Sequence, residues 1–446
     1  MNLRLVSFMS NKPKPGSCHG FPGLDPECSF TLVNRENVSL GDLFSQAQQI
    51  SLSLPEGRYA LNLCRDRYLF TVCYLAVIFR SQINLLPQNQ SPGCIQNLLE
   101  NYSGSYTISD DPASQYPGFI ITPGLVRNGA GQFPGIAENC IVSISFTSGS
   151  TGNPKPIPKT IGEFLKSARL ATDRLGIASG LHLVSTVPPQ HMYGLETSVF
   201  WPLVAGATIQ SYRPFFPEDI RRTLSESAKP CLLISTPTHL KACVESNLCW
   251  TNLAGVLSST AAMPVKLAKT IESRFGVPLL EIFGSTETLS FASRRLTVSE
   301  QWQPYQSIRV RAERDFCTVQ GGHLRNPLRL DDRLEIDQNG CFTLTGRSSD
   351  LVKIGGKRAS LAELNRLINE IEGVRDGLFY FTEHGRLGAL VISRRSKKAI
   401  LAELRKSIDE VFLPRPFYRI QEIPRNELGK IVKLKLDRLI RAFDIA

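Results

Sequence analysis

Hydrophobic positions between residues 36 and 260 alternate between helical spacing and short continuous apolar runs. Helical spacing predicts helices over 38–54 and 68–80, and the second is apolar enough to be a buried helix. The apolar runs predict strands, most of them separated by helical patterns of about 10 to 20 residues. Because such spacing requires crossover connections, it predicts a largely parallel sheet, and α/β proteins bind ligands at the carboxyl ends of such strands. The predicted strands are 59–64, 105–111, 141–146, 182–187, 207–212, 231–236 and 255–260.

The pattern changes after residue 300, where short alternating strands with Gly and Asn turns replace the α/β rhythm. Near the C-terminus we expect a compact α+β unit that begins with a helix in 357–373. Ser360 is its predicted N-cap, and Glu363 would complete a capping box. Two strands, a helix over 397–412 and a basic terminal helix follow.

At 446 residues the chain is longer than one hydrophobic core usually organises. Its composition, 42% hydrophobic and 20% charged, is typical of a globular protein rather than a disordered or fibrous one. We predict an α/β fold in three parts: a large N-terminal domain of parallel-rich sheets flanked by helices (1–346), a hinge (347–352) and a small mobile C-terminal α+β domain (353–446).

Eleven cysteines are scattered along the chain without a CxxC pair, which argues against a zinc site or a disulfide framework and favours a reducing compartment. The N-terminal residues lack the apolar segment of a secretory signal. The longest apolar run, YLFTVCYLAVIF, is shorter than the roughly 20 residues that a membrane span requires. We therefore expect a cytoplasmic protein without a membrane span.

The net charge of +11 is concentrated near the C-terminus, where residues 394–446 contain 14 Lys and Arg against 7 Asp and Glu. These basic residues alternate with apolar residues at helical spacing, and no series of aromatic residues accompanies them. We expect a solvated basic face rather than a nucleic-acid platform. Such a face can attract the phosphates of a small ligand or an acidic protein.

The stretch SFTSGSTGNPKPIPK, residues 145–159, has little helix or strand character and follows a predicted strand. Its hydroxyl groups and backbone amides can converge on phosphate oxygens, since Gly149 and Gly152 permit conformations closed to other residues. Lys155, with Lys159 as a second candidate, would add mobile positive charge. The Walker sequence GxxxxGK[ST] is absent, which disfavours an ordinary P-loop kinase or ATPase. Taken alone, the stretch is more typical of a Ser/Gly linker.

Three further motifs follow in the chain: IFGSTET, GRSSDLVKIGGKRASLAEL and NELGKIVK. Together with SFTSGSTGNPK they resemble, in order and separation, the motifs of the adenylate-forming superfamily of acyl- and aryl-CoA synthetases, luciferases and peptide-synthetase adenylation domains. The resemblance covers residues 35–440, and it implies a carboxylic acid ligase that uses ATP and Mg²⁺.

The resemblance implies an ATP site to which all four motifs contribute. Thr286 would bond a phosphate oxygen, Glu287 would hold Mg²⁺, and Lys430 would offset negative charge on the reacting carboxylate and α-phosphate. The β- and γ-phosphates would bind Thr147, Ser148, Gly149, Ser150, Thr151, Gly152 and Lys155. The adenosine would contact Phe283, Gly284, Ser285, Asp332 and Arg347.

Two positions depart from the family pattern. The family's TGD is replaced by Leu330, Asp331 and Asp332, so either aspartate could bind the ribose. Pro156 stands where the family commonly has Gly, and it stiffens the chain after Lys155 without removing a phosphate-binding group.

The resemblance also implies a pocket for the acid and a second working orientation of the small domain. The pocket would include His191, Tyr193, Ser259 and Thr260, although His191 could equally be a structural hydrogen-bonding residue. Asp350 would be the hinge. In the second orientation Lys353, Gly355 and Gly356 would lie against the thiol's tunnel.

These assignments predict an AMP-forming acid–thiol ligase. It would activate an aryl or fatty acid as acyl-AMP, release pyrophosphate and transfer the acyl group to the thiol of CoA or of a phosphopantetheinyl carrier protein. An acidic acyl carrier protein is the candidate protein partner, and we expect no nucleic acid. The alternative is a catalytically weak relative that binds nucleotide or a carrier protein as a scaffold. Its signature would be loss of the lysine, the glutamate or the hydroxyl loop, and all three are present.

Overall fold

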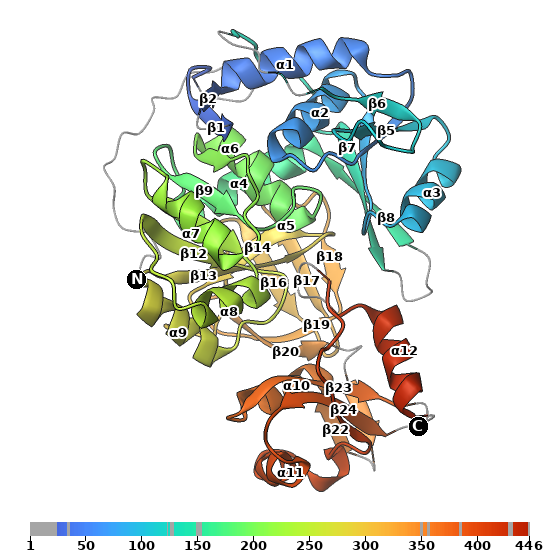
Figure 1. The fold of residues 1–446 in the computed structure, drawn as a ribbon, viewed down its shortest axis with the longest axis vertical. Coiled ribbons are helices and arrows are strands. Elements are labelled where there is room, and N and C mark those ends of the chain that lie inside the picture. Colours follow the sequence, from blue (N-terminus) through green and yellow to red (C-terminus); the bar gives the residue numbers. More distant parts are fainter. Residues whose placement is uncertain are drawn as a thin grey trace.

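The computed structural model describes residues 25–33, 36–122, 124, 129–148, 154–347, 351–354, 357–382, 386–426 and 431–444. They form a large unit of sheets and helices and a smaller C-terminal unit, drawn in orange to red (Figure 1). The helices are α1 (Leu40–Ser53), α2 (Arg67–Phe79), α3 (Pro92–Asn101), α4 (Ile161–Leu175), α5 (Met192–Leu195), α6 (Trp201–Ala205), α7 (Pro217–Ser225), α8 (Pro237–Glu245), α9 (Val265–Phe275), α10 (Leu361–Glu370), α11 (Lys397–Leu404) and α12 (Lys433–Asp444).

A nine-stranded sheet forms one half of the large unit. Its six central strands run parallel, and antiparallel strands flank them at both edges. This confirms the largely parallel sheet predicted from the apolar runs. In spatial order the strands are β15 (Gln303–Pro304), β14 (Leu289–Arg294), β13 (Leu279–Ser285), β12 (Leu253–Ser258), β11 (Cys231–Ser235), β9 (His182–Ser185), β10 (Thr208–Gln210), β1 (Ser29–Val33) and β2 (Glu36–Ser39).

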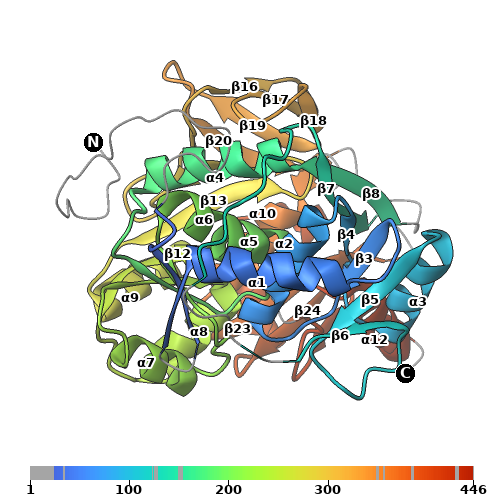
Figure 2. The same cartoon turned by 90° about the horizontal axis from the view of Figure 1, so that it is seen from above.

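A six-stranded sheet forms the other half, and only its edge strand β8 runs antiparallel. Seen from above, α1 and α2 lie between the two sheets (Figure 2). Every residue of α2 from Arg67 to Ile78 is buried, which confirms the predicted buried helix. In spatial order the strands are β6 (Gly118–Ile120), β5 (Ser105–Ser109), β3 (Tyr59–Asn62), β4 (Ile83–Leu86), β7 (Ile141–Ser148) and β8 (Pro154–Thr160).

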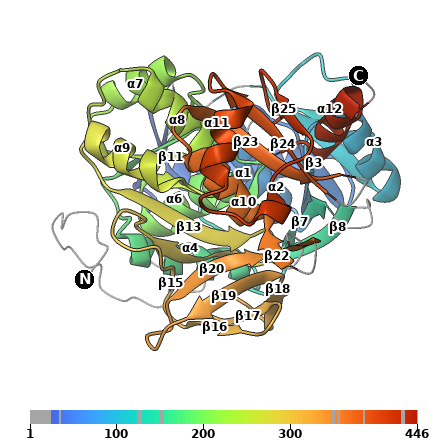
Figure 3. The same cartoon turned by 90° about the horizontal axis from the view of Figure 1, so that it is seen from below.

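Short antiparallel sheets lead from the large unit into the smaller one, whose own three-stranded sheet is mixed because its last two strands pair parallel. Seen from below, α10, α11, β23 and β24 lie in front of the large unit, close to β20 and β22 (Figure 3). The ammonium of Lys241 on α8 donates to the carbonyl of Arg375 on β23, which joins the two units. The strands are β16 (Ile308–Ala312), β17 (Cys317–Gly321), β18 (Leu328–Leu330), β19 (Asp332–Ile336), β20 (Phe342–Arg347), β21 (Leu351–Ile354), β22 (Lys357–Ser360), β23 (Val374–Phe381), β24 (Leu387–Ser393) and β25 (Phe417–Arg419).

The smaller unit has its own buried core, to which Val352, Ile368 and Phe379 contribute. The predicted division into domains at 346 and 353 stays a prediction, and residues 348–350 of the proposed hinge lie outside the described part of the chain. Within that part, no helix combines the length and hydropathy that a bilayer crossing requires.

Two predictions in the smaller unit are wrong. Ser360 is the N-cap of α10, but its side chain makes no capping hydrogen bond, and the Glu363 carboxylate pairs with Arg366 instead of closing the capping box. The helix expected over 397–412 ends at Leu404. Asp409 starts a separate 3₁₀ turn there by accepting a hydrogen bond from the amide of Val411 at 3.2 Å, and such local capping competes with helix propagation.

Candidate active site

The described residues of the hydroxyl-rich stretch, 145–148 and 154–159, lie on the two strands of a β-hairpin. β7 and β8 pair antiparallel, with Thr147 opposite Lys155 and Ser148 opposite Pro154. The Lys155 side chain is exposed and makes no hydrogen bond or ion pair with any described residue. The register therefore brings an unpaired cation beside the two strand ends that carry the loop. The predicted phosphate-binding residues of the loop itself lie outside the described residues: Gly149, Ser150, Thr151 and Gly152.

The expectation that 145–159 has little strand character was wrong. Pro154, Pro156 and Pro158 alternate along β8, which is an edge strand paired only with β7. Because proline has no N–H, the amides that reach β7 belong to the intervening residues, and the prolines occupy the positions that face outward. The hairpin is thus stiffened, and its free edge offers few donors to another strand.

The IFGSTET motif forms the tight turn between β13 and β14. Ser285 and Thr288 close this turn: the amide of Ser285 donates to Thr288 Oγ1 at 2.9 Å, and the amide of Thr288 donates to Ser285 Oγ at 3.3 Å. A Cβ atom on Gly284 would lie 2.0 Å from the carbonyl oxygen of Leu289, so only glycine fits. The turn presents Thr286 and Glu287 at the carboxyl end of β13, where ligands of α/β sheets bind.

Phe283, the predicted adenine contact, belongs to an aromatic cluster under this turn. Its ring centroid lies 5.3 Å from Phe291, 5.2 Å from Trp302 and 5.9 Å from Phe342. The ring nevertheless remains partly exposed. One side of the ring is therefore fixed by packing while another is open to a flat ligand.

Glu287 is the candidate Mg²⁺ ligand, and its surroundings fit that role. The carboxylate is partly exposed and makes no hydrogen bond or ion pair with the described residues. The described part of the chain contains no cluster of three or more His, Cys, Asp or Glu side chains arranged to hold a metal. A single carboxylate nevertheless suits Mg²⁺, which commonly binds one or two carboxylates together with the phosphates of a substrate.

The ribose candidates differ sharply in environment. Asp332 is buried on β19 and lies directly opposite Arg347 of β20 in the strand register. Asp331 is 72% exposed and approaches Arg329 on the surface at 3.8 Å. Of the two aspartates, Asp332 is therefore the one that the register sets opposite Arg347, and Asp331 lies at the surface.

The four predicted pocket residues lie near the ends of β12 and α5. His191 caps α5, its Nδ1 accepting from the amide of Tyr193 at 3.3 Å. The Tyr193 hydroxyl is buried and donates to the carbonyl of Leu257 at 3.0 Å. Ser259 Oγ donates to the carbonyl of Ile282 at 3.0 Å, and Thr260 adopts φ +80°, which is uncommon for a residue with a Cβ. These contacts tie the loop after β12 to β13.

Of the five residues assigned to the hinge and the smaller unit, Lys353 is within the described part of the chain. Asp350, Gly355, Gly356 and Lys430 lie outside the described residues. Lys353 stands on β21, opposite Arg358 in the register. Residues 425 and 431, on either side of the segment that contains Lys430, form an antiparallel bridge, and Arg425 pairs with Asp376 of β23 at 3.0 Å.

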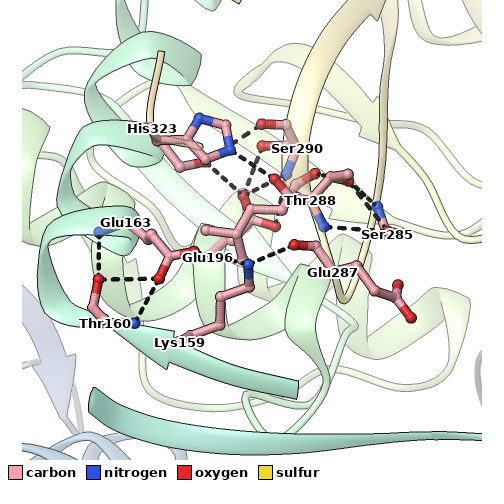
Figure 4. Close-up of polar contacts among 11 residues, drawn as sticks. Lys159, Thr160, Glu163, Glu196, Ser285, Glu287, Thr288, Ser290 and His323 are labelled. Carbon is pink, nitrogen blue, oxygen red and sulfur yellow. Dashed lines mark hydrogen bonds and ion pairs between the residues drawn. The ribbon is translucent and has the colours of Figure 1, made fainter. Parts of the chain in front are cut away.

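A buried polar network beneath the Glu287 turn was missed by the sequence reading (Figure 4). The expectation that Lys159 is a mobile cation is wrong, since its side chain is only 3% exposed. Its Nζ donates to Glu163 Oε1 at 3.0 Å and to the main-chain carbonyl of Glu287. Glu163 also accepts from the amide of Thr160 at 2.9 Å, closing a capping box on α4. The sequence Thr-x-x-Glu before an apolar run was the available signal.

Two further buried groups complete the network. The Glu196 carboxylate accepts from the amide and hydroxyl of Ser290, at 3.0 and 2.7 Å, and from the hydroxyl of Ser167 at 3.3 Å. Burial nonetheless raises the pKa of Glu196 above its ordinary value. His323 Nε2 donates to the carbonyl of Thr288 at 2.6 Å, and burial lowers the pKa of His323 to about 4. The imidazole is therefore neutral near pH 7.

Comparison with known proteins adds three kinds of likeness. Residues 49–311 match the family model described as AMP-binding enzyme. The chain is 23% identical over 352 residues to indoleacetate–CoA ligase of Aromatoleum aromaticum, covering 69% of each chain. Its fold is similar to ATP-bound MatB of Rhodopseudomonas palustris, with a TM-score of 0.80, 17% identity and coverage of 94% and 97%. It is also similar to o-succinylbenzoate CoA synthetase (MenE) of Bacillus subtilis in complex with ATP and magnesium, with a TM-score of 0.77, 19% identity and coverage of 93% and 97%.

Proposed function

The chain belongs to the AMP-binding enzyme family, within the adenylate-forming superfamily, and on that premise we propose that it is an ATP-dependent carboxylic acid ligase. It joins an acid to a thiol through an acyl-adenylate. The observation that carries the proposal is the turn between β13 and β14, which is closed by hydrogen bonds and presents the Glu287 carboxylate without a partner among the described residues. The names of the similar proteins, which are CoA ligases and synthetases, agree with this reaction.

In the first half-reaction the carboxylate of the acid attacks the α-phosphorus of ATP, and pyrophosphate leaves. Lys155, with the loop that follows β7, holds the β- and γ-phosphates. Thr286 donates its hydroxyl to a phosphate oxygen, and Lys430 offsets the charge that develops at the reacting centre. Glu287 would hold Mg²⁺, which when bound neutralises phosphate charge. No side chain needs to act as a nucleophile, because the substrate carboxylate supplies the attacking oxygen.

The nucleoside is held from two directions. Phe283 offers the open side of its ring to adenine, and the Asp332 carboxylate accepts hydrogen bonds from the ribose hydroxyls, with Arg347 opposite it. His191, Tyr193, Ser259 and Thr260 form part of the wall on the acid's side, where the hydrogen bonds of Tyr193 and Ser259 to neighbouring carbonyls fix its shape. An aryl or fatty acid is the proposed substrate.

In the second half-reaction the smaller unit turns about Asp350, and Lys353, Gly355 and Gly356 come to line the path of the thiol. The acceptor is the thiol of CoA or of a phosphopantetheine arm on an acidic carrier protein. The basic residues between 394 and 441 support an anionic acceptor, since ten of them are exposed: Arg394, Lys397, Lys398, Arg405, Lys406, Arg415, Arg419, Lys435, Arg438 and Arg441.

The test is ATP–pyrophosphate exchange with a panel of aryl, fatty and amino acids, followed by thioester formation with CoA and with a phosphopantetheinylated carrier. We expect exchange with at least one aryl or fatty acid and thioester with one of the two thiols. A folded protein that binds ATP but exchanges pyrophosphate with no acid would refute the ligase and favour a nucleotide-binding scaffold. Exchange without thioester on either thiol would refute the proposed acceptors alone.

A further inference from the structure

Lys159 is a buried cation that contacts the main chain of Glu287, the candidate metal-binding residue. It lies on β8 of the six-stranded sheet, whereas Glu287 follows β13 of the nine-stranded sheet. Its ammonium donates to the main-chain carbonyl of Glu287, not to the carboxylate. In Figure 4 the Glu287 side chain extends away from Lys159 while its carbonyl faces the ammonium. The contact therefore fixes the backbone at residue 287 and leaves the carboxylate available.

The ammonium itself is held rigidly. Glu163 Oε1 accepts from Nζ at 3.0 Å, and Glu163 is fixed in turn because its other oxygen accepts from the amide of Thr160 at 2.9 Å. The side chains of Lys159 and Glu163 are 3% and 11% exposed. A charge-assisted hydrogen bond in such a dry site is stronger than one at the surface. Lys159 thus links the capped end of α4 to the Glu287 turn.

The neighbours of Glu287 in the turn are held by other groups. The carbonyl of Thr288 accepts from His323, and the amide of Ser290 donates to the buried Glu196 carboxylate. Within the described residues, the hydrogen bond from Lys159 is the one that reaches the carbonyl of Glu287. Removing that donor would leave this carbonyl without its partner, at the residue whose side chain would bind the metal.

We propose that Lys159 is a positioning residue for Mg²⁺: it holds the main chain of Glu287 so that the carboxylate stands ready for the ion that accompanies ATP. This rests on the proposed function. A small displacement of a ligating carboxylate weakens Mg²⁺ binding steeply, because Mg²⁺ demands near-octahedral geometry at short distances.

The positioning role and a purely electrostatic role predict opposite signs. A positive charge near a cation site opposes Mg²⁺, so if charge alone mattered, Lys159→Met would tighten Mg²⁺ binding. If positioning matters, the same variant weakens it, because the carboxylate is no longer fixed. Loss of one hydrogen bond from a charged donor corresponds to about tenfold in a dissociation constant.

The experiment measures the affinity of the full-length protein for a fluorescent ATP analogue across a Mg²⁺ series, with no acid present, so that no turnover occurs. In Lys159→Met we expect affinity without Mg²⁺ to stay within twofold of wild type, and the Mg²⁺ concentration for half-maximal enhancement to rise about tenfold. ATP–pyrophosphate exchange should recover at high Mg²⁺. Lys159→Arg, which keeps a donor, should restore part of the shift.

Two variants separate positioning from general stability. Glu163→Gln removes the ion pair but keeps the ammonium and its bond to Glu287, so its Mg²⁺ dependence should stay within twofold of wild type despite a lower melting temperature. Lys166→Met removes an ion pair with Glu138 from a side chain that is 52% exposed, and it should change neither property. If Lys159→Met does not fold, Lys159→Gln takes its place, with an expected shift of at least threefold.

Three results would each overturn the inference. The first is wild-type Mg²⁺ dependence in folded Lys159→Met or Lys159→Gln, and the second is tighter Mg²⁺ binding in either variant. The third is an equal shift in Glu163→Gln and Lys159→Met. Failure of the proposed function has a different signature, since the wild type itself would then show no ATP binding or no exchange with any acid.

Discussion

The strand that ends in the Glu287 turn carries a buried ion pair whose removal should be costly. Glu281 on β13 lies opposite Arg294 on β14, with Arg294 Nε 2.7 Å from Glu281 Oε2. The Glu281 side chain is 3% exposed and that of Arg294 is 14% exposed. The guanidinium carbon lies 4.1 Å from the ring centroid of Trp302, and Nη1 donates to the carbonyl of Glu300 at 3.0 Å.

Arg294→Met keeps the apolar stem of the side chain and leaves the Glu281 carboxylate buried without its counter-ion. Breaking a buried pair from one side costs about 3 to 5 kcal/mol. Burial already raises the pKa of Glu281, so the variant can take up a proton in place of the lost cation, and we expect the lower figure, about 3 kcal/mol. Glu281→Gln leaves Arg294 its contacts with Trp302 and Glu300, so about 1 to 2 kcal/mol is expected.

The assay is urea denaturation at pH 7 of wild type, both single variants and the double variant. The double variant should be more stable than Arg294→Met alone, because no unpaired charge remains. Arg329→Met is a matched control: this arginine also stacks on an aromatic ring, Phe316 at 4.0 Å, and lies near an acid, but it is 64% exposed and should cost less than about 1 kcal/mol. A loss below about 1 kcal/mol in Arg294→Met, or strict additivity in the double variant, would refute the reasoning.

Four other changes probe the site. Lys155→Ala should weaken ATP binding about 10- to 100-fold with an unchanged melting temperature, because the exposed ammonium has no described partner; calorimetry with Lys155→Arg as control checks this. On going from pH 7 to pH 5, His323→Gln should lose about 2 kcal/mol less stability than wild type. The pKa of folded His323 is lowered to about 4, so the unfolded chain takes up the proton first and wild-type stability falls as the pH falls through this window. Urea midpoints of both proteins at both pH values test this. Asp332→Asn should abolish the preference for ATP over 2′-deoxy-ATP in exchange assays, whereas the exposed Asp331→Asn should keep it. Lys430→Ala should slow acyl-adenylate formation about 10²- to 10³-fold yet leave thioester formation from a supplied acyl-adenylate near wild type, and equal losses in both steps would contradict its proposed role.

Strands and helices that are fully buried could be predicted from the sequence, because they appear in it as continuous apolar runs. The continuous apolar runs that became β9, β11 and β12 lie in the middle of the nine-stranded sheet, where both faces are covered. β8 was not predictable in the same way, because three prolines suppress strand character in a local reading. The hairpin forms because β8 is an edge strand. It needs hydrogen bonds to β7 on one side only, and its prolines can face the other side.

In the candidate site, too, the features that depend on neighbouring residues could be predicted, and those that depend on distant residues could not. Local motifs located the Phe283–Glu287 turn and the glycine that it requires, since both depend on neighbouring residues. The support of that turn depends on long-range contacts: Lys159 is 128 positions from Glu287, and Glu196 is 94 positions from Ser290. A lysine in a loop-like sequence is most often exposed, and only tertiary packing could reveal that this one is buried.

The two lysines of the hairpin therefore lie in different environments, one exposed and one buried. Lys155 stands near the tip of β8, where it is exposed to a ligand, and Lys159 stands near its base, where it contacts the carbonyl of Glu287. Alternating prolines make the strand between them stiff. Because of that stiffness, a displacement of Lys155 is expected to be transmitted through Lys159 to the Glu287 turn. The departure from glycine at Pro156 then has a physical consequence: if Lys155 and Glu287 have the roles proposed above, the phosphates and the metal ion are positioned through one stiff strand.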